Sequence, residues 1–413
     1  MRTLMLSVCL AVAAMATAEP IALVNVHVIP MTANRVLRDH VVVVEAGRIR
    51  SVGPRDATTI PENATTIDGE GGFLIPGLID LHAHLGHGGE SLFVLNGVTT
   101  VLLAGDGVRS IEGALAPNVV ACGPSIVGVK TAAEAEKVVE AQKTAGFDCI
   151  KIYDEIDAEA LQPLVHAARK RNMLSIAHIP RNLTWQQMLA AKPDAIAHLE
   201  EFLYSPVDVG EDHVIVGRML AGDIAVISTL TTYDVITRQV ADLETMFERG
   251  ENAYIAADHK NDWTRDRNRY RGIQQKQLPK MRRLLVFQKD LARMLSSAGG
   301  RVLAGTDAGG PPFVIPGFSM TDELRLLVSA GLAPYDALRA ATVEAARFLK
   351  RDELGTIEAG KAADLVLLRG DPLRDIDNVA LRAGVMVRGR WLDAAAIGAE
   401  LDRIRVGSEG ASP

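Results

Sequence analysis

Two histidines spaced two residues apart end an apolar stretch near the amino terminus of the chain. This stretch runs from Phe73 to the pair His82 and His84. In a β-strand the side chains of residues i and i+2 lie on one face, so both imidazole rings can bind the same metal ion. Alone, such a pair is a weak signal, because it arises by chance and an isolated buried histidine is more often only hydrogen-bonded. Residues from other strands must complete any metal site.

Four residues with suitable chemistry follow short apolar runs further along the chain. They are Lys151, His178, His198 and Asp307. Each stands at the carboxyl end of a strand-like run, and a (β/α)8 barrel places its active site at the carboxyl ends of its strands. A divalent metal held by such nitrogen and oxygen ligands lowers the pKa of a bound water from near 15.7 to about 7. The residues therefore predict a site that activates water.

Strand-like and helix-like patterns alternate in the middle of the chain, which favours parallel βαβ units. Eight apolar runs are strand candidates: 78–82, 99–103, 119–122, 149–153, 174–178, 195–199, 225–230 and 302–306. Amphipathic patterns predict helices in the gaps, for example over 131–145 and 158–171. We therefore expect an α/β protein with a closed (β/α)8 TIM barrel over residues 76–355.

Three other segments complete the expected organisation. Short strands and turns fill 19–75 and 356–413, and the two pieces can bury each other's apolar faces as one composite β-sandwich. The segment 241–297 is too long for a single connection and is rich in charge and helix formers. We expect it to form helices beside the barrel mouth, either as a partial lid or as a solvated helical hairpin.

Composition limits the classes of partner. The chain has 413 residues, with 48% apolar and 23% charged residues, which is ordinary for a globular protein. Its formal net charge of −7 argues against nucleic acid as a partner. We expect a small-molecule substrate, and barrels of this type often pair as homo-oligomers.

The first 18 residues have the layout of a cleavable secretory signal. Arg2 precedes a short apolar centre, and small residues precede Glu19. A membrane anchor is the alternative, but the apolar run is short for a span of about 20 residues. We expect an exported protein, either periplasmic or secreted, with no membrane anchor after cleavage. The mature chain then keeps Cys122 and Cys149, which could pair, although their places in barrel strands favour buried thiols.

The order of these motifs resembles the amidohydrolase superfamily, nearest its imidazolonepropionase-like and prolidase-type dipeptidase branch. The resemblance rests on the segments 76–84, 304–307 and 360–366 and covers nearly the whole mature chain. It implies two divalent metal ions, with zinc as the first choice, although manganese, cobalt, iron or nickel would also suit such ligands.

The resemblance also implies a role for each ligand. His82 and His84 would bind the more buried metal, and Lys151 would be carboxylated by CO₂. Strands five and six would supply His178 and His198, and Asp307 would end strand eight.

Each role has a simpler alternative. Lys151 lies between two isoleucines, so a bare ammonium would be costly to bury in the barrel, yet it could also be a lysine at the barrel mouth paired with an acid. His178 and His198 could be hydrogen-bonded core histidines. Asp307 would ligate metal and act as the catalytic base toward the attacking water, or it could cap a helix.

Four further residues are candidates for substrate contact. His87 follows the metal pair by one turn, and Tyr153 and Tyr233 follow predicted strands, from which either could donate a hydrogen bond to a developing oxyanion. Arg181 could hold a substrate carboxylate through its forked donors. Packing or surface roles are the alternatives for all four.

The leading hypothesis is hydrolysis of an amide or related C–N bond in a small molecule, with a dipeptide or N-acyl amino acid favoured. A cyclic amide, a lactone or a phosphotriester is an alternative substrate. A mononuclear deaminase fits less well, because deaminases of this superfamily carry a glutamate where this chain has Arg181, and they lack the bridging lysine. A non-catalytic barrel scaffold would be expected to lose ligands, and none is lost.

Overall fold

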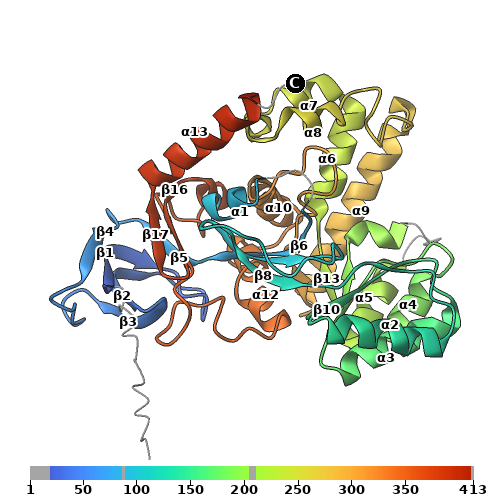
Figure 1. The fold of residues 1–413 in the computed structure, drawn as a ribbon, viewed down its shortest axis with the longest axis horizontal. Coiled ribbons are helices and arrows are strands. Elements are labelled where there is room, and N and C mark those ends of the chain that lie inside the picture. Colours follow the sequence, from blue (N-terminus) through green and yellow to red (C-terminus); the bar gives the residue numbers. More distant parts are fainter. Residues whose placement is uncertain (1–18, 86–88, 204–210, 411–413) are drawn as a thin grey trace, which may run out of the picture.

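The computed structural model describes residues 19–85, 89–203 and 211–410 (Figure 1). The expected signal, 1–18, and His87 lie outside these residues. No helix in the described ranges is long and apolar enough to cross a membrane.

Strands from both ends of the chain pair in a single eight-stranded sheet. Its order is β17-β16-β15-β5-β1-β2-β3, with β4 paired to β1. The strands are β1 (Ile21–Val28), β2 (Leu37–Glu45), β3 (Arg48–Pro54), β4 (Thr65–Asp68), β5 (Phe73–Pro76), β15 (Leu365–Leu368), β16 (Arg382–Val387) and β17 (Arg390–Asp393). Antiparallel pairing of β15 with β5 joins the two ends and aligns Leu365 with Pro76. The two ends thus share backbone hydrogen bonds as well as apolar contacts.

Nine short parallel strands form the frame of the site. A three-stranded sheet contains β6 (Leu78–Ala83), β7 (Val98–Leu103) and β8 (Asn118–Ala121). A six-stranded sheet contains β9 (Ile126–Val127), β10 (Cys149–Asp154), β11 (Leu174–Ala177), β12 (Ala195–Ala197), β13 (Ala225–Ile227) and β14 (Val302–Leu303). Every expected strand has a counterpart, while β9 was not expected.

The two sheets meet at two seams instead of forming the continuous closed barrel that we expected. Single bridges join Cys122 to Cys149 and Ala83 to Ala308. At the second seam the side chain of Asp80 also takes part, since Thr306 N donates to its Oδ1 at 3.0 Å. Backbone hydrogen bonds also cross this seam, from Leu81 N to Ala304 O, from Asp307 N to His82 O and from His84 N to Ala308 O.

A disulfide spans the first seam. Cys122 and Cys149 are bonded and fully buried. The expectation of two buried thiols is therefore wrong. The bridge between their strands brings the two Cα atoms to 4.3 Å, within the reach of a disulfide.

Helices surround these sheets (Figure 1). The longer ones are α2 (Ala132–Thr144), α3 (Ala158–Lys170), α5 (Asp212–Gly222), α6 (Leu230–Ala241), α9 (Leu278–Ser297), α10 (Phe318–Ser329) and α13 (Ala394–Gly410). Shorter ones are α1 (Ser91–Leu95), α4 (Trp185–Ala191), α11 (Pro334–Ala340) and α12 (Val343–Phe348). Helix α2 begins with a capping box in which Thr131 and Glu134 bond each other's backbone, as its sequence pattern predicts.

The long segment between β13 and β14 is mostly helical. Besides α6 and α9 it holds α7 (Leu243–Phe247), α8 (Ala257–Asn261) and the 3₁₀ turns η2 (Gly250–Tyr254) and η3 (Gln275–Gln277). Its turn around Asn268 reaches the cavity described next, so this insertion is more than a solvated hairpin.

Candidate metal centre

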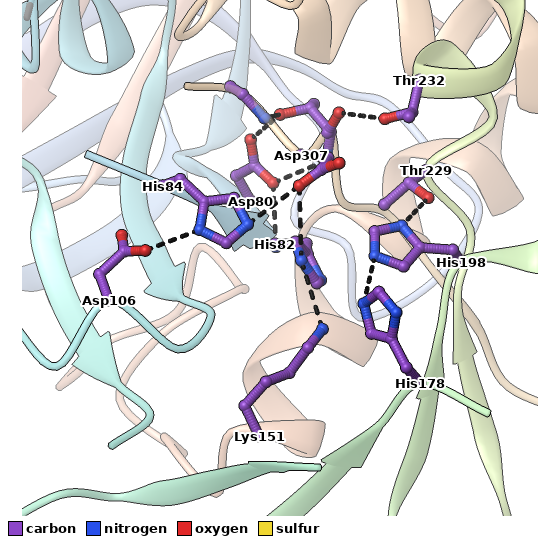
Figure 2. Close-up of polar contacts among 12 residues, drawn as sticks. Asp80, His82, His84, Asp106, Lys151, His178, His198, Thr229, Thr232 and Asp307 are labelled. Carbon is purple, nitrogen blue, oxygen red and sulfur yellow. Dashed lines mark hydrogen bonds and ion pairs between the residues drawn. The ribbon is translucent and has the colours of Figure 1, made fainter. Parts of the chain in front are cut away.

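The six predicted metal ligands meet at one cavity (Figure 2). They come from the carboxyl ends of β6, β10, β11, β12 and β14. The cavity has a volume of about 430 Å³, and its lining includes His82, His84, Lys151, His178, His198 and Asp307. Parallel strands that end at the same edge bring together residues that are up to 225 positions apart in the sequence.

One half of the centre is built around Asp307. Its Oδ1 lies 3.0 Å from Nε2 of His84 and 3.6 Å from Nε2 of His82. Lys151 Nζ lies 3.4 Å from the same His82 nitrogen. Ligand atoms of His82, His198 and Asp307 all fall within 4.8 Å of one another, so His198 lies between the two halves of the centre, close enough for a metal ion to contact all three.

The other half consists of two imidazoles that face each other. Nε2 of His178 lies 3.0 Å from Nε2 of His198. Glu201 lies 3.0 Å from Nδ1 of His178, so that nitrogen donates and the Nε2 lone pair points at its partner. Thr229 contacts Nδ1 of His198 at 2.7 Å. Two nitrogens that converge in this way are arranged to share a cation.

Burial sets the charges of these ligands. It lowers the pKa values of His82, His178 and His198 well below the ordinary value, which keeps the rings neutral, as metal ligation requires. Burial also lowers the pKa of Lys151 to about 7. In His84 the effect of burial is outweighed by hydrogen bonds to Asp106 and Asp307, which raise the pKa to about 9.

Three acidic residues that the sequence reasoning did not assign orient these ligands. Asp106 bonds Nδ1 of His84 at 2.7 Å, Glu201 bonds His178, and buried Asp80 accepts from the backbone of His82 at 3.1 Å. Signals for them were present, because Asp80 lies two residues before His82 and Asp106 follows the second strand. Glu201 lies three residues after His198.

The predicted substrate contacts divide into two groups. Tyr153 lines the cavity, with its ring 4.6 Å from that of His178. Arg181 and Tyr233 are not among the described residues that line it. Arg181 lies 3.7 Å from Glu201, and Tyr233 is buried with Ile236 and Met281 beside α9. Besides Asp106, the polar lining residues Ser125 and Arg269 were missed.

Comparison with known proteins identifies the class. The amidohydrolase family matches residues 73–392. The chain therefore belongs to the amidohydrolase family. This membership supports a metal-binding hydrolase that acts on C–N bonds.

Individual relatives lie on several branches. Imidazolonepropionase of Sphingopyxis alaskensis is 25% identical over 81% of this chain and 87% of its own length. Adenine deaminase 2 of Rhizobium etli is 27% identical over 73% of this chain and 46% of its own. A match to adenine deaminase 2 of Agrobacterium fabrum, at 47% identity, spans only 10% of that protein.

Solved structures agree on the fold. A putative prolidase from Bifidobacterium longum has a TM-score of 0.70 and 26% identity, covering 94% of this chain and 99% of its own. An Xaa-Pro dipeptidase with bound methionine has a TM-score of 0.71 at 18% identity, covering 91% of this chain and all of its own. These neighbours indicate a TIM-barrel protein with an added β-domain.

Proposed function

We propose that this protein is a binuclear metal-dependent hydrolase that cleaves an amide or related C–N bond, with a dipeptide or an N-acyl amino acid as the favoured substrate. The observation that carries the proposal is the facing pair of His178 and His198 nitrogens beside Lys151 and Asp307. The prolidases among the structural neighbours support the choice of substrate.

The donor set fits two divalent ions, with zinc as the first choice. His82, His84 and Asp307 would hold one ion, and His178 and His198 the other. When bound, the ions supply Lewis acidity that makes water nucleophilic near neutral pH. Hydrogen bonding and the nearby imidazoles lower the pKa of Asp307 against the opposing effect of burial. Its carboxylate is therefore ionised and can accept the proton of the attacking water.

Lys151 would join the two halves as a carbamate. Its Nζ is buried between the histidines and Asp307, where an ammonium is costly. Attack of the neutral amine on CO₂ forms an N–C bond and releases one proton, which leaves an anionic group able to bridge two cations. Bicarbonate added during metal reconstitution should then raise the recovered activity, and a Lys151→Met variant should respond to short carboxylic acids. Equal recovered activity with and without bicarbonate would contradict the carbamate.

Metal analysis tests the centre directly. Purified protein should contain about two equivalents of metal, and both should be lost in His178→Ala and Lys151→Ala. His166→Ala, on the exposed face of α3, is the matched control and should retain both. Wild-type protein without metal after growth with added zinc would refute the hydrolase and favour a non-catalytic scaffold.

Substrate identity requires a screen of dipeptides and N-acyl amino acids. Tyr153, which is 44% exposed and lines the cavity, is placed to donate a hydrogen bond to the oxyanion that develops on the scissile carbonyl. Hydrolysis of cyclic amides, lactones or phosphotriesters in place of these compounds would change the substrate class that we assign but keep the mechanism of metal-assisted hydrolysis.

A mononuclear deaminase is the second candidate, because adenine deaminase 2 proteins are among the relatives. Glu201 counts against it, since its two oxygens bond His178 Nδ1 and the backbone N of Ile179 and are thus committed to orientation. Ammonia release from adenine with one bound metal would favour the deaminase, whereas two metals and no such release favour the hydrolase.

We also propose that the two central sheets act as one (β/α)8 barrel over residues 76–355, with 19–75 and 356–413 as the composite β-domain. The bridges at both seams support this division. Export with cleavage after residue 18 is supported by the buried disulfide, since disulfides persist in oxidising compartments. A periplasmic fraction whose protein begins at Glu19 would test it.

A further inference from the structure

One arginine lines the candidate metal centre without any role in holding the metal. Arg269 comes from the insertion between β13 and β14 and faces the same cavity as the histidines and Lys151. The other charged residues that line the cavity are the predicted ligands and Asp106, which bonds His84. Arg269 is therefore the one charged lining residue, among those described, that is left for a substrate.

The guanidinium is held by its neighbour and not by an acid. Its Nη2 donates to the Tyr270 hydroxyl at 2.7 Å, and its carbon lies 5.0 Å from the centre of the Tyr270 ring. No carboxylate in the described ranges forms an ion pair with Arg269. Its remaining donors can therefore bind an incoming anion.

Buried amides fix the turn that carries Arg269. Asn268 is 3% exposed, and its Nδ2 donates to Gln239 Oε1 at 2.9 Å. The Gln239 amide in turn donates to Pro312 O at 3.2 Å, in the loop that follows Asp307. Since this loop follows the strand end that supplies a metal ligand, the chain of amides sets the position of Arg269 relative to the reacting groups.

The charge of the surrounding segment also favours the binding of an anion. Residues 260–283 contain nine lysines and arginines but only two aspartates, a positive excess inside a chain whose net charge is −7. A basic segment beside a cavity raises the local concentration of anions and their rate of entry.

We infer that Arg269 binds a carboxylate of the substrate, so that the pocket selects dipeptides and N-acyl amino acids with a free carboxylate over the corresponding neutral amides. This inference rests on the proposed hydrolase. Arg269 would act on specificity, and Tyr270 would be its positioning residue.

The test compares N-acetyl amino acids with their primary amides. The ratio of kcat/KM for acid over amide should fall about 10- to 100-fold in Arg269→Gln, mainly through KM for the acid. Arg269→Lys keeps the charge but loses the fork, so its ratio should be intermediate. Arg267→Gln is the matched control, because Arg267 is exposed, pairs with Asp262 at 3.3 Å and does not line the cavity.

Binding separates this inference from the proposed function. Dissociation constants for the same pairs, measured in an Asp307→Asn background, should show the same dependence on Arg269 even if the wild-type protein hydrolyses none of the pairs. Binding that depends on Arg269, together with no hydrolysis by wild type, would support the carboxylate site and contradict the hydrolase. A wild-type protein that binds acid no better than amide, or an acid preference unchanged in Arg269→Gln, overturns the inference even if both compounds are hydrolysed.

Discussion

At the scale of single residues, Asp106 orients His84, one of the predicted metal ligands. Its Oδ1 bonds Nδ1 of His84 at 2.7 Å, and its Oδ2 accepts from the backbone N of Leu85 at 2.9 Å. An amide at this position could present its NH₂ to the imidazole and disturb the tautomer. We predict that Asp106→Asn lowers metal affinity or kcat/KM about 10- to 100-fold, a typical effect for such partners. Competition with a chelator measures the affinity, and exposed Asp56→Asn should leave it unchanged.

The buried carboxyl of Glu323 makes stability depend on pH. Glu323 of α10 accepts from the Ser228 hydroxyl at 2.5 Å and from Thr231 N at 2.8 Å. Burial raises its pKa from 4.5 to about 7 despite these bonds. Because the folded state holds this proton more tightly than the unfolded state, the free energy of unfolding falls as pH rises from 4.5 through 7.

We therefore predict that in Glu323→Gln the free energy of unfolding decreases less between pH 5 and pH 8 than in wild type, by an amount on the order of 2–3 kcal/mol. Denaturant unfolding at pH 5 and pH 8 measures it, and exposed Glu112→Gln should behave like wild type. An identical fall in both variants would mean that Glu323 does not titrate in this range.

At the scale of elements, the disulfide secures the seam between β8 and β10. Only one bridge joins the strands there, and β10 carries Lys151 two residues beyond Cys149. We predict that replacing both cysteines by alanine lowers the free energy of unfolding by about 3–4 kcal/mol, as expected for a loop that closes 27 positions. Denaturant unfolding of oxidised wild type, reduced wild type and the double variant measures this. Equal stability of all three would contradict it.

The strands also show how far the sequence determines this site. Apolar runs that end in His178, His198 or Asp307 were sufficient to predict that these residues meet in one cavity, because strand ends meet at one edge. Closure was less predictable, since part of the contact at the second seam is made by the Asp80 side chain, which accepts from Thr306 N and Oγ1. The pairing of Cys122 with Cys149 depends on strand neighbours, and the approach of Arg269 depends on the contact of Asn268 with Gln239. Neither contact produces a periodic pattern in the sequence from which it could be predicted.

At the scale of the whole molecule, α13 links the β-domain to the helical insertion. It starts directly after β17 and runs toward α7 and α8 (Figure 1), contacting η2 on the way. Ile397, Leu401 and Ile404 recur at helical spacing and pack against the main core. Ser408 then donates its hydroxyl hydrogen to Ala253 O at 2.6 Å. The insertion that delivers Arg269 is thus tied to the far end of the chain.

We predict that Ile404→Asp loosens the insertion, because it places a charge on the packed face of α13. The free energy of unfolding should fall by about 1–3 kcal/mol. Hydrogen exchange should become faster in η2, and KM for acidic substrates should rise as Arg269 loses its fixed position. Val406→Asp is the matched control, since Val406 is 62% exposed on the same helix. Lower stability with unchanged exchange in η2 would instead mean that α13 stabilises the β-domain alone and leaves the insertion independent of it.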